Sequence, residues 1–293
     1  MDYGILSAIL SPILSSVATI FKSGATKALS PLAVASFGTI IGGTLIMIFL
    51  IFRKKRPTIK KIKENKKDFF KLILFRGILG EIFIVFGLSM TAAIKAIFFT
   101  KIEAYFVLFL SWFLKKERIK PIHIVLVSAN IVGVILLSTA GDFSMLGTSQ
   151  IGDLFIIIAM AFFACSYFYS QRLSKKIGAL TTSSVSQLTG GLFLLPFVLF
   201  LIPQTEIVSL TGWYYLLSFV LLFNVVGLSL WYFSLKTVKP WIVSALRAIG
   251  PLAGAPLAFL MFGDVLNLVQ IVGAAIILVS SSAIVYEHRR KPL

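Results

Sequence analysis

The chain has 293 residues, of which 58% are hydrophobic and 13% charged, with a mean hydropathy of +0.97 and a formal net charge of +17. Soluble domains carry roughly 25% charged residues, so the composition indicates an integral membrane protein without a soluble domain. The single cysteine, Cys165, excludes an internal disulfide and a cysteine-based metal site, and His123 and His288 lack ligand-like spacing, so no metal site is expected.

Apolar runs of about twenty residues, the length that crosses a bilayer as a helix, predict ten membrane-spanning helices. In chain order these helices cover residues 4–22, 31–52, 69–89, 92–114, 121–139, 151–171, 181–202, 211–235, 240–262 and 266–286. The N-terminus shows neither the basic region nor the cleavage site of a secretory signal, so we expect the first run to stay in place as a helix. The predicted fold class is therefore an all-α integral membrane protein.

The two halves of the chain share a repeat. Phe21 to Gly43 aligns without gaps on Tyr169 to Gly191, and five pairs are identical: Lys27/Lys175, Leu32/Leu180, Ser36/Ser184, Gly42/Gly190 and Gly43/Gly191. Five predicted spans, an odd number, separate the copies, so the second half should cross the membrane in the opposite sense. We expect two inverted five-helix repeats at residues 1–141 and 151–287, followed by a cytoplasmic tail at 288–293.

Lysine and arginine favour cytoplasmic loops, and their positions predict the orientation of the chain. The basic residues gather on one side, in the segments Arg53 to Lys67, Lys115 to Lys120, Arg172 to Lys176, Lys236 to Lys239 and Arg289 to Lys291. The opposite loops at 140–150, 203–212 and 263–267 contain no lysine or arginine, and Lys22 and Lys27 in the first loop depart from the pattern. We expect a multi-pass protein of the plasma membrane with both termini in the cytoplasm.

The same pattern accounts for the high net charge without nucleic acid, and no nucleic-acid partner is expected. Two interpretations of the segment Arg53 to Lys67 stay open. The favoured one is a determinant of topology, and the other is a surface that binds anionic lipid head groups.

Five ionisable side chains lie deep within predicted spans, where each costs roughly 2.5 to 3.5 kcal/mol on insertion scales. They are Arg76 and Glu81 in the third span, Lys101 and Glu103 in the fourth, and Arg247 in the ninth. The first four either form a binding site or proton relay, or pair with one another to hold the third and fourth helices together. Arg247 either binds an anionic group, which suits a guanidinium, or is a partner of Glu81 or Glu103.

Lys101 and Glu103 are two residues apart, so they point about 200° away from each other on a helix. One of them should line a polar pathway while the other packs on a neighbouring helix. The aromatic stripe that contains Lys101 and Tyr105 is the favoured lining, and the stripe that contains Glu103 is the alternative.

Weaker polar features extend the predicted pathway. Ser11 and Ser15 lie on one face of the first helix, and Asn224 and Trp231 share a stripe on the eighth. Helix packing is the more common role of serine within membranes, so each of these positions is a weak candidate. Asn130 and Gln187 are expected to form hydrogen bonds between helices.

The pattern of ten helices in two inverted halves, with a basic segment after the second helix, resembles the drug/metabolite transporter superfamily, specifically its EamA-type exporters. The resemblance covers nearly the whole chain, and its most telling motifs are Lys101 to Tyr105 leading to Lys116-Glu117, and Pro251 leading to Gly263-Asp264. The chain departs from the family pattern where Ala104 replaces a proline and Asp264 replaces a glutamate. The resemblance implies alternating access around a central cavity lined by the third, fourth, eighth and ninth helices.

The resemblance also implies transport without ATP, and the sequence contains no Walker-type phosphate loop. The leading hypothesis is a secondary transporter, of the exporting kind, for small polar metabolites such as amino acids. The alternatives are an exchanger of organic anions or phosphorylated sugars, and a non-transporting membrane assembly factor. Neither an enzyme nor a cofactor is expected, and monomer and homodimer both stay open.

Overall fold

The computed structural model describes residues 3–54, 59–91, 96, 99–115, 117–146, 151–253 and 267–290, and in these ranges the chain forms helices and no strands. The first half contains α1 (Tyr3–Ala28), α2 (Pro31–Phe52), α3 (Ile59–Glu64), α4 (Lys66–Leu72), η1 (Ile73–Gly80), α5 (Glu81–Met90), η2 (Thr100–Ile102), α7 (Glu103–Lys115), α8 (Pro121–Thr139) and η3 (Phe143–Leu146). The second half contains α9 (Ile151–Ile177), α10 (Ala179–Leu201), η4 (Gln204–Glu206), α11 (Leu210–Phe219), η5 (Val220–Gly227), α12 (Leu228–Thr237), α13 (Pro240–Ala245), η6 (Leu246–Ala253) and α15 (Leu268–Arg290).

Eight helices in the described part of the chain are long and apolar enough to cross a membrane. Two of them are composite: Lys66–Met90 joins α4, η1 and α5, and Leu210–Thr237 joins α11, η5 and α12. The other two expected spans, 92–114 and 240–262, fall partly outside the described residues, and their described parts are helical. The all-α membrane fold is confirmed, and these parts are consistent with ten spans.

The two halves pack on each other through residues that the sequence repeat matches. Within this interface α2 packs chiefly on α10. A Cβ atom added to Gly43 would lie 3.0 Å from the carbonyl oxygen of Ser184, and one added to Gly191 would lie 2.8 Å from that of Ser36. Because Ser36 matches Ser184 and Gly43 matches Gly191, these two contacts are the same contact made in both directions, as a two-fold relation between the halves requires.

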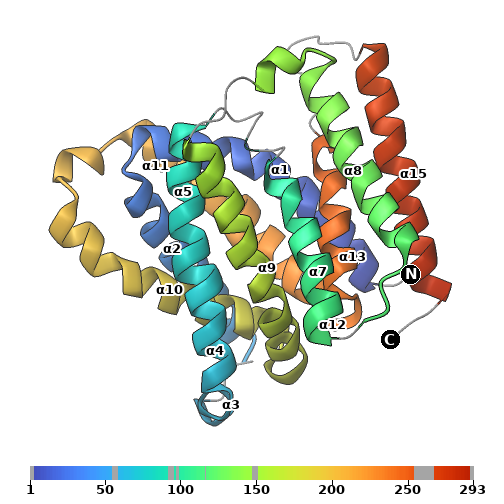
Figure 1. Cartoon of the computed structure of the whole chain (residues 1–293). Coiled ribbons are helices and arrows are strands. Elements are labelled where there is room, and N and C mark those ends of the chain that lie inside the picture. The colour runs from blue at the N-terminus through green and yellow to red at the C-terminus, as the bar shows by residue number, and fades with distance from the viewer. Residues whose placement is uncertain are drawn as a thin grey trace.

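The irregular segments also occur in pairs. The third and eighth spans each contain an eight-residue π-helix, η1 and η5, and each π-helix ends in a glycine. The fourth and ninth spans contain the 3₁₀ segments η2 and η6. π-Helical turns within membrane helices are rare and frequent at functional sites. Both pairs lie near the centre of the molecule, between α2 and α10 on one side and α8 and α15 on the other (Figure 1).

Contacts between loops show that the basic segments share one end of the molecule. Asp68 accepts a bond from Arg172 at 2.9 Å, and Asn65 accepts one from Lys176 at 3.0 Å, which joins the segment after α2 to the end of α9. Lys120 bonds Glu287 at 2.9 Å, which joins the segment before α8 to the end of α15. In Figure 1, α3 and the end of α9 lie toward the lower part of the view.

Candidate functional site

A cavity of about 90 Å³ lies between the two halves. A single water needs roughly 10 to 15 Å³ measured this way, so the cavity holds several waters or a small molecule. Both repeats supply its polar lining, which comprises Ser15, Thr19, Lys22, Thr39, Arg76, Glu81, Thr100, Ser186, Gln187, Asn224, Tyr232 and Arg247. The π-helices contribute directly, since Arg76 lies in η1 and Asn224 in η5.

Lys22 and Glu81 form an ion pair in the cavity wall. Lys22 Nζ, on α1, contacts Glu81 Oε1 at the first residue of α5, and the two side chains are only 9% and 13% exposed. Lys22 Nζ also lies 5.0 Å from the centre of the Phe219 ring, a cation–π contact. The carboxylate and the ring face together form an environment that suits an ammonium group.

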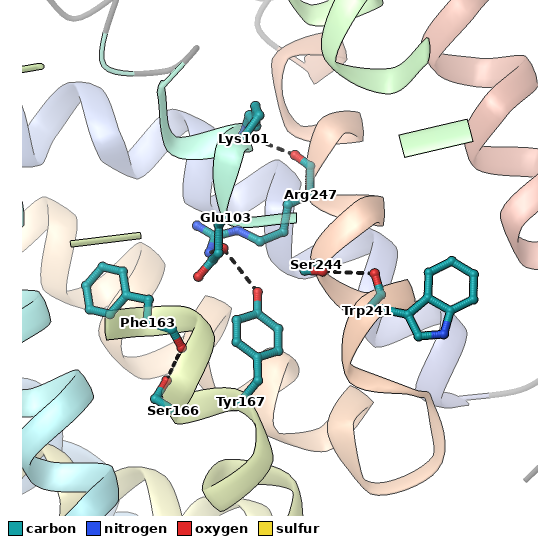
Figure 2. A network of polar contacts seen from close by, with 8 residues as sticks. All are labelled: Lys101, Glu103, Phe163, Ser166, Tyr167, Trp241, Ser244 and Arg247. Carbon is teal, nitrogen blue, oxygen red and sulfur yellow. Dashed lines mark hydrogen bonds and ion pairs between the residues drawn. The ribbon is translucent and has the colours of Figure 1, made fainter. Parts of the chain in front are cut away.

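Glu103 and Arg247 form a second ion pair, which joins the fourth and ninth spans. Arg247 Nη1 contacts Glu103 Oε2, and the Tyr167 hydroxyl donates to the same oxygen at 3.2 Å (Figure 2). Lys101 Nζ donates to the backbone carbonyl of Arg247 at 3.1 Å. Glu103 is 1% exposed, so this pair is buried and fixes the position of the Arg247 guanidinium at the cavity.

Arg76 has a different environment from the other cations of the cavity. Its guanidinium carbon lies 4.1 Å from the ring centre of Trp231 and 5.1 Å from that of Phe163. Its Nη1 atom is buried and lacks a hydrogen-bond partner among the described residues. Aromatic faces hold the plane of a guanidinium but do not use its N–H donors, which point outward from the edge of the plane. Arg76 therefore lines the cavity and carries a buried donor that no described residue accepts.

Amide hydrogen bonds hold the walls of the cavity together. Gln187 Nε2 donates to Ser183 Oγ at 3.0 Å and to the Asn224 carbonyl at 3.1 Å, and Asn224 Nδ2 donates to the Gly38 carbonyl at 2.8 Å. These bonds join α10, η5 and α2. The expected interhelical role of Gln187 is confirmed, and so is that of Asn130, which accepts bonds from two serines of α15.

The structure separates the predicted site residues into three groups. Ser15, Arg76, Glu81, Asn224 and Arg247 line the cavity. Three others lie just behind the wall. Trp231 packs under Arg76, Glu103 pairs with Arg247, and Ser11 donates to the Gly227 carbonyl at 2.8 Å, joining α1 to η5.

Lys101 and Tyr105 form the third group, and here the structure corrects the sequence prediction. Lys101 faces a separate void of about 10 Å³, and Tyr105 is 37% exposed and bonded to Ser128 at 2.7 Å. The favoured stripe thus points away from the cavity, and Glu103, on the alternative stripe, lies behind the cavity wall, where it pairs with Arg247. The physical reason is that the spacing of two side chains on opposite faces leaves the rotation of the helix about its axis open, and the packing of α7 on α9 and α13 sets that rotation.

The observed ion pairs also differ from one of the predictions, in which the four deep charges of the third and fourth spans pair with one another. Arg76, Glu81, Lys101 and Glu103 do not pair with one another, because Glu81 pairs with Lys22 and Glu103 with Arg247. The alternative role of Arg247, a partner of Glu103, is observed. Sequence reasoning missed Lys22 as a site residue, although its departure from the charge pattern of the loops was a usable signal.

Comparison with known proteins identifies the family. The model of the EamA-like transporter family matches residues 2–139 and again 150–286, which together cover nearly the whole chain. The chain belongs to the EamA-like transporter family. The predicted resemblance is confirmed, and the chain is a transporter and a multi-pass membrane protein.

Two relatives of this EamA-like transporter carry the same general description. It is 26% identical over 241 residues to the uncharacterised transporter YetK of Bacillus subtilis, a match that covers 80% of this chain and 72% of YetK. It is 24% identical over 295 residues to an uncharacterised transporter of Methanothermobacter thermautotrophicus, with coverage of 94% and 84%. A solved structure superposes with a TM-score of 0.79 at 15% identity, covering 98% of each chain, which shows that the fold is shared.

Proposed function

We propose that this EamA-like transporter is a secondary transporter that moves a small, carboxylate-bearing metabolite through the central cavity by alternating access. Amino acids and small organic anions are the two substrate classes that share this group. The observation that carries the proposal is that Arg76 lines the cavity without an ionic or hydrogen-bond partner among the described residues. A buried cation without an ionic partner is costly, and an anionic ligand removes that cost.

The three cations that line the cavity are not equivalent. Lys22 is matched by Glu81 and Arg247 by Glu103, whereas Arg76 rests on aromatic rings. A guanidinium binds a carboxylate through parallel, charge-assisted hydrogen bonds, which give both affinity and orientation. Arg76 is therefore better suited to hold a substrate carboxylate than Arg247, which the sequence favoured. The small cavity favours an amino acid or a small organic acid over a phosphorylated sugar.

Alternating access is supported by the relation between the halves. The two repeats are inverted and meet at the cavity, which lies between them, and each contributes one π-helix and one 3₁₀ segment to its wall. Such irregular segments supply backbone that can change its hydrogen bonding when one half rocks against the other. Export is the proposed direction, so overproduction of the protein should lower the cellular content of its substrate.

We further propose that the protein lies in the plasma membrane with both termini in the cytoplasm. The clustering of the basic segments at one end of the molecule supports this orientation. A reporter that is active only in the cytoplasm, fused after residue 293, should be active. Activity of a reporter that works only outside the cell would contradict the orientation.

The function is tested by counterflow in proteoliposomes with a panel of radiolabelled amino acids and small organic acids. Arg76→Gln should reduce the initial rate at low substrate by at least about tenfold, because charge-assisted hydrogen bonds contribute about 1.5 to 3 kcal/mol. Arg76→Lys should retain part of the rate, since it keeps the charge but not the paired donors.

Arg172→Gln is the matched control for the Arg76 variants. The Arg172 side chain is 50% exposed at one end of the molecule, and exposed ion pairs contribute little to stability. Its rate should equal that of the natural sequence. Full counterflow by Arg76→Gln would refute the role of Arg76. A folded natural protein that moves no compound of the panel, and copurifies with a stable partner, would favour the assembly-factor alternative.

A further inference from the structure

Lys22 has a position that neither topology nor a surface role explains. It lies within the apolar helix α1, near the end that leads into the first loop. The other loops predicted on that side of the membrane contain no lysine or arginine. It is 7% exposed, and its ammonium is held by Glu81 and the Phe219 ring inside the cavity wall. A carboxylate beside an aromatic face is the kind of site that would bind the ammonium group of an amino acid.

We propose that Lys22 is an internal ammonium that occupies the amine side of the site, so that the substrate is a small monocarboxylate without an amino group. The inference rests on the proposed function and narrows its substrate class. Glu81, the carboxylate that would receive a substrate amine, is already paired with Lys22. Arg76 lines the same cavity and has no carboxylate partner among the described residues.

The charges of the described residues at the cavity support a monoanion. Of the three cations that line the cavity, Lys22 is neutralised by Glu81 and Arg247 by Glu103, so Arg76 leaves an excess of one positive charge. A monocarboxylate brings this sum to zero, whereas a zwitterionic amino acid leaves it unchanged. Lys101 is left out of this sum because it faces a separate void.

An amino acid would also have to compete with Lys22 for Glu81, which makes its binding less favourable. Its ammonium would have to displace Lys22 from Glu81, and Lys22 would then be a buried cation without a carboxylate. A 2-hydroxy acid of the same carbon skeleton avoids this exchange, because its hydroxyl group is neutral. Lys22 therefore acts as a specificity-determining residue that discriminates against amines.

The test uses pairs of competitors with identical skeletons, L-lactate against L-alanine and 2-hydroxyisovalerate against L-valine. Their half-inhibitory concentrations are measured in counterflow by the reconstituted full chain. The natural protein should prefer each hydroxy acid by about tenfold or more. Lys22→Gln frees Glu81 and should shift the ratio toward the amino acid by about tenfold or more.

Lys22→Gln/Glu81→Gln is the matched control, since it removes both charges and leaves Arg76 untouched. It should keep the preference for the hydroxy acid, because no carboxylate is exposed to an amine. A natural protein that prefers alanine, or a ratio that Lys22→Gln leaves unchanged, would overturn the inference but not the proposed function. A folded protein without counterflow of either class would overturn the proposed function itself.

A second variant keeps the inference testable if Lys22→Gln does not fold. Glu81→Gln releases the Lys22 ammonium into the cavity beside Arg76, so a dianion should gain relative to a monoanion. The ratio of the half-inhibitory concentrations of malonate and propionate should shift toward malonate by about tenfold. An unchanged ratio in a folded Glu81→Gln protein would contradict the assignment of Lys22.

Discussion

Glu103 and Arg247 form a buried ion pair in which each charge depends on the other for compensation. The carboxylate is 1% exposed, and its Oε2 atom accepts from both the guanidinium and the Tyr167 hydroxyl, while Oε1 has no hydrogen-bond partner among the described residues. Breaking a buried pair leaves one charge uncompensated, whereas removing both charges is often nearly neutral. The pair is therefore sensitive to single changes and tolerant of the matched double change.

Glu103→Gln should lower the free energy of unfolding by about 3 kcal/mol, the low end for a broken buried pair, because the amide still accepts a hydrogen bond. Glu103→Gln/Arg247→Gln should recover most of that loss. Thermal unfolding in detergent measures both. A single variant as stable as the natural protein, or a double variant less stable than the single one, would be inconsistent with the pair.

The sequence located the deep charges, but of their partners it offered only the pairing of Arg247 with Glu81 or Glu103, as one of two alternatives. The five predicted residues all lie within the spans as expected, because depth follows from position along an apolar run. A partner depends instead on rotation about the helix axis, which the spacing of Lys101 and Glu103 leaves open and the packing of α7 on α9 and α13 sets. Lys22 was treated as a loop charge because the first span was expected to end at residue 22, whereas α1 continues to Ala28.

Among the elements, the helices that the sequence predicted best are the long, regular apolar ones. Eight of the expected spans, all but the fourth and the ninth, correspond to long apolar helices in the described part of the chain. The π-helices η1 and η5 had no such signal, because apolar periodicity over eight residues hardly distinguishes an α-helix from a π-helix. Their equivalent places in the two halves became visible only in the structure.

Glycines lie where membrane helices of this protein cross closely, and some of them belong to the sequence repeat. Gly133 and Gly273, on α8 and α15, approach each other reciprocally, since an added Cβ on either would lie within 2.8 Å of the other's carbonyl oxygen. Between α2 and α10, Gly43 approaches the carbonyl oxygen of Ser184, and Gly191 approaches that of Ser36. Close crossing of membrane helices requires small residues, so identities persist where the halves touch. The cavity, in contrast, is lined by side chains that differ between the halves.

In the whole molecule, the inverted repeat sets the arrangement of the helices. The charged residues that have no counterpart in the other half supply the groups that can bind a substrate. The third span carries Arg76 and Glu81, whereas the eighth carries Asn224, which is tied to α2. The cavity therefore has one wall that can bind an anion and another that is held by amide bonds. The central claim is that the substrate binds at this cavity between the halves.

Substrate protection of one cysteine tests this claim most directly. Ser15 lines the cavity, and Cys165, the single native cysteine, is replaced by alanine to give a Ser15→Cys protein in a Cys165→Ala background. The rate at which a methanethiosulfonate reagent labels this cysteine is measured in proteoliposomes with and without a transported monocarboxylate. The account predicts that the substrate slows labelling in proportion to its occupancy. Labelling at the same rate with saturating substrate, in a protein that still transports it, would contradict the account.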